Sequence, residues 1–330
     1  MDTESLILVE HLSEHFVEAL DAQQLAELEE GEKSEIMFFL EISRHIQEIE
    51  MLFNVFRFNL LNMLDMFTLT LSDELIRNGQ INLQITDTEA IIQDKKASLE
   101  ISDKIAINAL LISFISSGKT LVKSIETFIQ SDFSEEFKAP KGLNKEWIST
   151  IYDENFYYRF MIHLRDFAQH GHLPVSVTDS KFGFDLYQIL NTPHFLHNAA
   201  RRKQFESIVK EILEGSEYPR LGFTYHVAGY NLCITQLYVD FLRKSKSTFK
   251  ICSRKLKSLV EKYSSNIIKS PDDQTGFFAF MLDDGKLHLL DPYSSILDTF
   301  GEFQKRAKKV LDEEKIAYGE FVSGIKRHPN

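Results

Sequence analysis

The spacing of apolar and polar positions predicts a mostly helical chain. Apolar residues recur three and four positions apart over residues 32–70, 102–129 and 156–168, which is the spacing of one helical face. The first segment is apolar on more than one face, so we expect it inside a helical bundle, with a dimer interface as the alternative. The same reasoning predicts further helices over residues 3–30, 193–214, 221–243 and 295–314.

Other segments alternate between apolar and polar residues, which is typical of strands. These segments are residues 80–85, 175–178 and 181–189. A hairpin is predicted where Asp283, Asp284 and Gly285 separate residues 277–282 from residues 286–290, because Asp-Gly supplies the backbone conformation of a tight turn. The pattern therefore predicts a mainly α fold with small β-hairpin additions and an α+β region towards the C-terminus.

Composition and charge narrow the classes of function. The 330 residues carry a net charge of −12, which argues against a general nucleic-acid coat but not against an enzyme with a small basic cleft. Two cysteines, Cys233 and Cys252, are too few for a disulfide framework or a four-cysteine zinc site. We find no uncharged apolar run of about 18 residues and no basic stretch that would begin a signal peptide. We therefore expect a cytoplasmic protein without a membrane span.

The end of the helix at residues 156–168 has the highest density of side chains that could bind a ligand or take part in catalysis. It carries Arg165, Asp166 and His170 among aromatic residues, and His172 follows closely. Gly171 stands where a left-handed C-terminal cap would lie, so His170 is expected in the last helical turn. Charged groups among apolar residues must be paired with each other or take part in binding or catalysis, because burying them without a partner is costly.

The motif Arg165-Asp166-Phe-Ala-Gln-His170 resembles the signature of the HEPN superfamily (higher eukaryotes and prokaryotes nucleotide-binding), an Arg-x4-His pattern near the end of a helix in an all-α bundle. The resemblance implies a HEPN-like bundle over residues 1–215 with an inserted β-hairpin, followed by the α+β region over residues 216–330. It also implies a metal-independent endoribonuclease without a cofactor. Such enzymes act on RNA as homodimers, often with an antitoxin or another partner protein in toxin–antitoxin or phage-defence systems.

In that family, the arginine and the histidine are the catalytic pair. The resemblance therefore assigns catalysis to Arg165 and His170, with Asp166 as the orienting residue. The chemistry is consistent, because an imidazole transfers protons near neutral pH and a guanidinium binds phosphate oxygens. We expect His172 and the basic run Arg201-Arg202-Lys203 to contact the substrate, although a solvated helix face is the alternative for that run. The spacing of the nearby histidines does not demand a metal site.

Three alternatives stay open. Arg165 and Asp166 also fit a structural ion pair in a non-catalytic helical module for dimerisation or protein interaction. The run Ser116-Ser-Gly118-Lys-Thr120 resembles part of a P-loop, but position 113 is serine instead of glycine, which favours helix packing at Gly118. The basic segment 244–262 fits an RNA backbone, an acidic partner such as residues 4–30 of another chain, or a solvated helix face.

Overall fold

The computed structural model describes residues 28–78, 101–130, 145–178, 181–184, 186–214, 223–263, 267–269, 276–281, 287–290 and 296–327. The chain divides into two compact units. Unit 1 contains Met1–Glu48, Asp132–Lys141 and Leu242–Lys305, and unit 2 contains Ile49–Ser131, Gly142–Phe241 and Arg306–Asn330. The sequence pattern instead predicts one boundary, between residues 215 and 216. A single boundary cannot describe this division, because three long helices contribute residues to both units.

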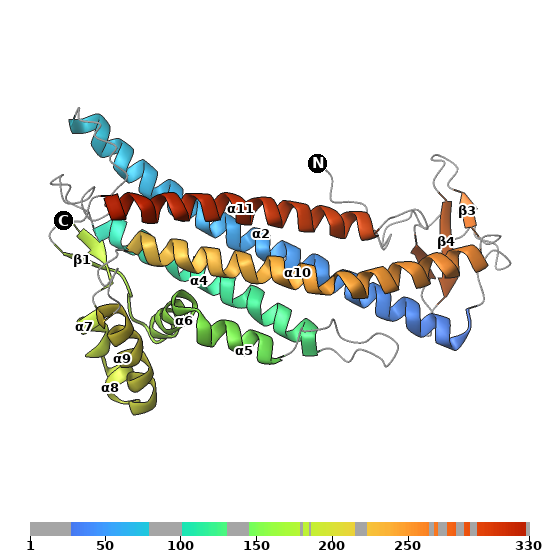
Figure 1. Ribbon diagram of the computed structural model, residues 1–330, viewed down its shortest axis with the longest axis horizontal. Coiled ribbons are helices and arrows are strands. Elements are labelled where there is room, and N and C mark those ends of the chain that lie inside the picture. Colours follow the sequence, from blue (N-terminus) through green and yellow to red (C-terminus); the bar gives the residue numbers. More distant parts are fainter. Residues whose placement is uncertain are drawn as a thin grey trace. The chain divides into compact units, whose positions relative to one another are not determined.

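The mainly α class is confirmed, and helices dominate the described residues (Figure 1). They are α2 (Glu30–Asn78), α4 (Ile101–Gln130), α5 (Lys145–Glu154), α6 (Phe156–Gln169), α7 (Leu186–Leu190), α8 (Pro193–Leu196), α9 (Ala199–Glu214), α10 (Phe223–Lys262) and α11 (Ile296–Arg327). The apolar segment at residues 221–243 and the basic segment at residues 244–262 form one continuous helix, α10.

Two elements predicted near the middle of the chain are wrong in extent. The predicted strand 181–189 ends at residue 183, and helix α7 follows it. The predicted helix 193–214 is divided into α8 and α9, because the side chain of Asn198 accepts a hydrogen bond from the backbone N–H of Arg201 at 3.1 Å. This is the geometry of a helix N-cap, so a new helix begins there.

The strands form two small antiparallel sheets. Strand β1 (Ser176–Thr178) pairs with β2 (Lys181–Gly183). The second sheet has the order β3 (Ile267–Lys269), β4 (Gly276–Met281) and β5 (Leu287–Leu290), with Phe280 opposite His288. The predicted strand at residues 80–85 and most of the helical segment at residues 3–30 lie outside the described residues.

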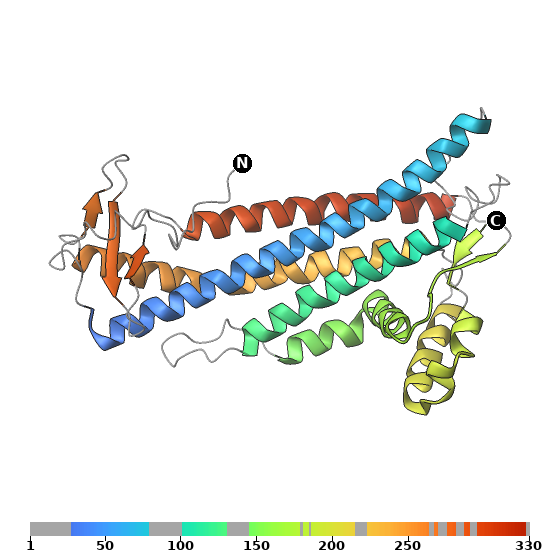
Figure 2. The ribbon, with the colours of Figure 1, turned by 180° about the vertical axis from the view of Figure 1, so that it is seen from behind.

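The core of unit 2 is an aromatic cluster that joins four helices. The ring of Phe56 from α2 stacks on Phe114 from α4, with centroids 4.9 Å apart. Tyr230 from α10 lies edge-on to both rings and stacks on Tyr158 from α6 at 6.1 Å. The two views of Figures 1 and 2 show α4 alongside α5 and α6 within this unit. A polar contact lies beside the cluster, where buried Glu50 accepts hydrogen bonds from Tyr238 and Arg306.

Gly118 is a packing position inside α4. A Cβ atom at Gly118 would lie 2.5 Å from the hydroxyl of Tyr230 and 3.1 Å from the ring of Phe56. Residues 101–130 are helical throughout, so the run Ser116–Thr120 does not follow a strand and does not form a phosphate-binding loop. The interpretation of Gly118 as a site of close helix packing is confirmed.

The length and apolar composition of α4 raise the question of whether this helix could span a membrane. Among the described residues, one helical stretch, Lys104–Ile129, is long and apolar enough to cross a bilayer by length and composition alone. Leu111, Phe114, Ile115 and Leu121 of this helix are fully buried in the protein. This is weak evidence for a membrane span, since a buried core helix has the same length and composition.

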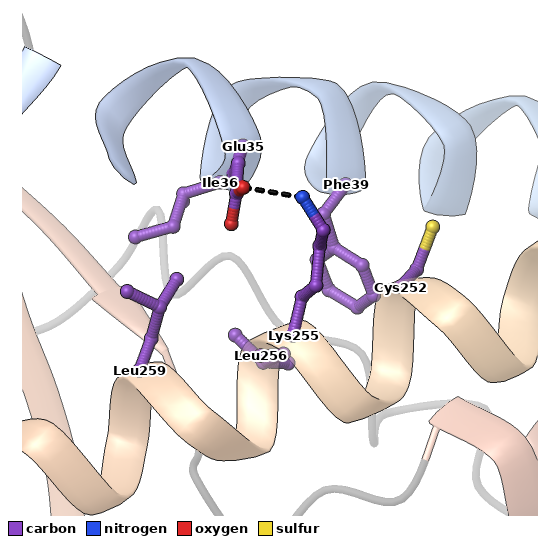
Figure 3. Close-up of a pocket in the computed structure, with 7 residues that line it drawn as sticks. All are labelled: Glu35, Ile36, Phe39, Cys252, Lys255, Leu256 and Leu259. Atoms are coloured by element: carbon purple, nitrogen blue, oxygen red, sulfur yellow. Dashed lines mark hydrogen bonds and ion pairs between the residues drawn. The ribbon is translucent and has the colours of Figure 1, made fainter. Parts of the chain in front are cut away.

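In unit 1, the start of α2 lies antiparallel to the end of α10. Glu35 pairs with Lys255, and Glu32 pairs with Lys262 about two turns further along α10. Figure 3 shows the small pocket between these helices, which the Glu35–Lys255 ion pair, Phe39 and Cys252 line together with other residues. Burial raises the pKa of the Cys252 thiol to about 11, so it is protonated near neutral pH.

The packing at Gly118 generates a stability prediction. Gly118→Ala should lower the free energy of unfolding by about 1–3 kcal/mol, because the new methyl group displaces the buried Tyr230 ring. Urea denaturation measures the change. Gly319→Ala in α11 is the matched control, since nothing lies within 4 Å of its Cβ position. A loss of stability no larger than in the control would contradict the packing role.

Candidate active site at the end of helix α6

Helix α6 begins and ends at well-defined caps. The side chain of Asn155 accepts a hydrogen bond from the backbone N–H of Tyr158 at 3.0 Å. At the other end, the N–H groups of His170 and Gly171 donate to carbonyl groups of the last turn. Gly171 has a φ of 84°, so the predicted left-handed cap is confirmed. These caps place His170 at the exposed C-terminal end of α6.

Helices α6 and α9 pack antiparallel through a series of side-chain contacts. Arg159 Nη2 pairs with Glu211 Oε2 at 2.7 Å, near the start of α6. The ring of His163 meets Phe205 with a centroid distance of 6.0 Å. At the end of α6, Arg201 Nη1 lies 3.4 Å from His170 Nε2. The structure therefore brings together His170 and Arg201, two of the residues selected from the sequence.

Arg165 has different partners. Its Nη1 donates to Gln169 Oε1 at 2.9 Å and to Asp166 Oδ1 at 3.3 Å. The Arg165 side chain is 23% exposed, and its Nε atom is buried without a hydrogen-bond partner. Arg165 therefore contacts residues of its own helix and does not contact His170. The two residues of the motif lie on neighbouring faces of α6, as their five-residue separation requires.

Sequence analysis missed His163, which lies on the same side of α6 as His170. The residue is 8% exposed, and burial lowers the pKa of its imidazole. The nearby Asp166 raises this pKa, whereas Arg201 and Arg159 lower it further. Asp166 and His170 follow His163 by three and seven residues. This spacing places all three on one helical face, so it could have identified His163 as a neighbour of the site.

The other predicted substrate-binding residues have different surroundings. Arg202 donates to Glu206 Oε1 at 2.7 Å and to the carbonyl of Leu190 at 3.3 Å, so it ties α9 to the end of α7. Lys203 is exposed. The ring of His172 stacks on Phe167 at a centroid distance of 4.7 Å. Arg201, in contrast, lies beside His170.

Asn108 fixes the segment that follows His170. Its amide nitrogen donates to the carbonyl of Val175 at 3.1 Å, and its amide oxygen accepts from the N–H of Val175 at 2.9 Å. Because Asn108 is fully buried in α4, this paired contact anchors the chain directly after the turn at Gly171. The polar residue in an otherwise apolar segment was a signal that the sequence analysis did not use.

The site offers groups for proton transfer and for anion binding. His170 is exposed, so its imidazole is accessible to a ligand, and the Arg201 guanidinium beside it can donate to phosphate oxygens. In the described part of the chain, no group of three or more His, Cys, Asp or Glu side chains is arranged to hold a metal ion. The side chain of His194 lies outside that part.

Comparison with known proteins gives no assignment: no family model matches the chain, and no curated protein or solved structure is significantly similar to it.

The buried imidazole of His163 generates a prediction about pH. Its folded-state pKa is lowered below the ordinary value of about 6.5, so the unfolded chain binds more protons in mildly acidic solution. The stability from His163 is therefore complete above about pH 6.5 and is lost as the pH falls, by at most about 1.4 kcal/mol per pH unit. Replacing His163 by Leu should flatten the decline in unfolding free energy between about pH 7 and pH 5.

Urea denaturation at several pH values tests this expectation. His197→Leu is the control, because His197 is an exposed histidine at the end of α8. An unchanged slope for His163→Leu, compared with the parent chain, would show that His163 does not titrate with unfolding.

Proposed function

We propose that the protein is a metal-independent endoribonuclease of HEPN type, which acts in the cytoplasm as part of a toxin or phage-defence module. The Arg-x4-His motif supports this proposal, together with one observation on the structure. His170 is exposed at the end of α6, and a guanidinium group, that of Arg201, lies 3.4 Å from its Nε2 atom. An imidazole can transfer the protons of phosphodiester cleavage, and a guanidinium can stabilise charge on the phosphate oxygens, so the pair suits cleavage without a metal.

The roles follow from the chemistry of the side chains. His170 transfers a proton, either from the attacking 2′-hydroxyl group or to the leaving 5′-oxygen. Arg201 binds the phosphate oxygens and stabilises the charge that develops on them. Arg165 is the second cation of the site, oriented by Asp166, and its partial exposure allows it to turn towards a phosphate. The proposal therefore departs from the family pattern, because the arginine beside His170 comes from α9.

A homodimer is part of the proposal. A two-fold axis beside α6 would place two copies of His170 in one cleft, so that one copy could act as base and the other as acid. The antitoxin or defence partner rests on the resemblance alone. The finer fold assignment, a HEPN-like bundle with added hairpins and an α+β C-terminal region, belongs to the same proposal.

Mutation of the contact pair tests the proposal. His170→Ala and Arg201→Ala should each reduce cleavage of single-stranded RNA by at least about 100-fold, because each removes a group needed in the transition state. Arg165→Ala should also abolish cleavage. The melting temperature should change by less than about 4 °C, since His170 is exposed and Arg201 is partly exposed.

Gln204→Ala and His197→Ala are the matched controls, because both residues are exposed in the same region and neither is a predicted site residue. Both controls should cleave RNA at the rate of the parent chain. Full activity in His170→Ala or in Arg201→Ala would exclude the proposed mechanism.

A second candidate function is a non-catalytic helical module that binds another protein or a second copy. The observation in its favour is an apolar surface on α2 within unit 2. Met51, Val55, Phe58 and Leu61 are 59%, 48%, 63% and 49% exposed and follow each other at helical spacing. In this alternative, Arg165 and Asp166 form a structural pair.

A double-mutant cycle on Arg165 and Asp166 separates the two functions. For a site pair with side chains 23% and 36% exposed, the coupling in unfolding free energy should be below about 1 kcal/mol. Urea denaturation of Arg165→Ala, Asp166→Ala and the double variant gives the value. A coupling of about 2 kcal/mol or more, without RNA cleavage by the parent chain, would favour the structural pair.

A further inference from the structure

The C-terminal half of α10 carries a row of exposed basic side chains, which we call the basic stripe. The stripe consists of Lys246, Lys250, Arg254 and Lys257. Their separations of four, four and three residues place them within about 80° of the helix circumference, at about 100° per residue. With a rise of about 1.5 Å per residue, the stripe is about 16 Å long. It lies in unit 1, which contains Leu242–Lys305.

The side of α10 that faces α2 shows how unit 1 neutralises its other cations. Figure 3 shows Cys252, Lys255 and Leu259 on this side, opposite residues of α2. There, Lys255 forms an ion pair with Glu35. Further along the same side, Lys262 pairs with two glutamates at the start of α2. The cations that face α2 therefore have carboxylate partners from the same chain.

The basic stripe is not neutralised in this way. Lys257 lies 4.0 Å from Glu261 of the same helix, and both side chains are mostly exposed, so this pair contributes little. Arg254 Nε donates to the backbone carbonyl of Lys250 at 3.2 Å, a contact that leaves the charge of the guanidinium uncompensated. Within the described residues, Lys246, Lys250 and Arg254 form no ion pair. The stripe is therefore a local concentration of positive charge in a chain whose net charge is −12.

The residues beside the stripe narrow the class of partner. Phe249 is the one aromatic residue of α10 within unit 1, and it is buried, so the stripe has no ring on which an unpaired base could stack. An interfacial helix inserts an apolar face into a bilayer, but the apolar side of α10 is packed against α2 and only Ile251 is exposed. Ser247 and Ser258, both exposed, border the cations with hydroxyl groups.

A row of cations bordered by hydroxyl groups matches the phosphate backbone of a nucleic acid. Double-stranded DNA carries about one negative charge per 1.7 Å of its axis, so 16 Å of a duplex presents about nine phosphates, about twice as many as one strand of the same length. A duplex of RNA is bound mainly through phosphate and 2′-hydroxyl groups, without base stacking. The basic stripe therefore suits a duplex better than a single strand.

We infer that the basic stripe binds the phosphate backbone of double-stranded RNA. The four cations contact phosphates, and Ser247 and Ser258 contact phosphate oxygens or 2′-hydroxyl groups. Binding does not depend on base sequence, because such contacts read no base edge. The choice of RNA over DNA rests on the proposed ribonuclease function, whose substrate would then be an RNA that contains a double-stranded stem.

Fluorescence anisotropy with a labelled RNA duplex tests the inference. All chains carry His170→Ala, so that the proposed active site does not cleave the RNA. The duplex should bind with a Kd of about 1–100 µM at physiological salt, the range of sequence-independent contacts. Lys250→Gln/Arg254→Gln should weaken binding at least about tenfold. It should also lower the slope of log affinity against log salt concentration by about two, because two phosphate contacts are lost.

Lys308→Gln/Lys309→Gln in α11 is the matched control, since it removes two charges at exposed positions outside the stripe. It should have a much smaller effect on the affinity and leave the salt slope unchanged. The single variant Lys246→Gln should lower the slope by about one. A stripe variant that loses no more affinity than the control would overturn the inference, and so would a parent chain that does not bind the duplex at low salt.

Three further ligands separate the sources of negative charge. A single RNA strand of the same sequence should bind more weakly than the duplex, and equal affinity would overturn the assignment to a duplex. A DNA duplex that binds more tightly than the RNA duplex would overturn the assignment to RNA. Vesicles that contain phosphatidylserine test a membrane surface. Stripe-dependent binding to vesicles, without binding to the RNA duplex, would overturn the inference in favour of a membrane.

The result can be separated from the test of the proposed function. Stripe-dependent binding of the RNA duplex, without RNA cleavage by the parent chain, would support the stripe as an RNA-binding surface and remove the ribonuclease. Cleavage of single-stranded RNA by the parent chain, together with duplex binding that does not depend on the stripe, would support the ribonuclease and overturn the inference.

Discussion

The buried hydroxyl group of Tyr230 is the constraint on which the packing of unit 2 depends. A buried phenol needs a hydrogen-bond partner, and the Tyr230 hydroxyl donates to the carbonyl of Ile115 at 3.1 Å. This bond is possible because Gly118 has no side chain where the Tyr230 ring lies. Burial also raises the pKa of Tyr230 well above its ordinary value, so the hydroxyl stays protonated and remains a donor. Tyr158 stacks on the same ring, which fixes α6 against α10.

The fixed position of α6 gives its two inner histidines different environments. His163 lies where α6 and α9 are in full contact, so its imidazole is buried and its pKa is lowered. His170 lies two turns later, at the capped end of the helix, and is exposed beside Arg201. The same side chain is thus a packing group at one position and a candidate proton-transfer group at the other. The difference comes from the distance of each residue to the end of the helix.

The basic side chains of α10 also differ in environment, according to the side of the helix on which they lie. Lysines on the side of α2 are paired with glutamates and have an assigned partner within unit 1. On the other side, Lys246, Lys250, Arg254 and Lys257 are exposed, in a chain whose net charge is −12.

The long helices, the cap at Gly171 and the packing role of Gly118 can be predicted from the sequence, because helical spacing, a positive φ and the absence of a side chain are local properties. The sequence also selected His170 and Arg201 as candidates, but it paired His170 with Arg165, its neighbour in the motif. In the folded chain, Arg201 lies beside His170, whereas Arg165 donates to Asp166 and Gln169. The register between α6 and α9 sets these contacts. That register depends on which residues the two helices bury against each other, which the spacing within one helix does not specify.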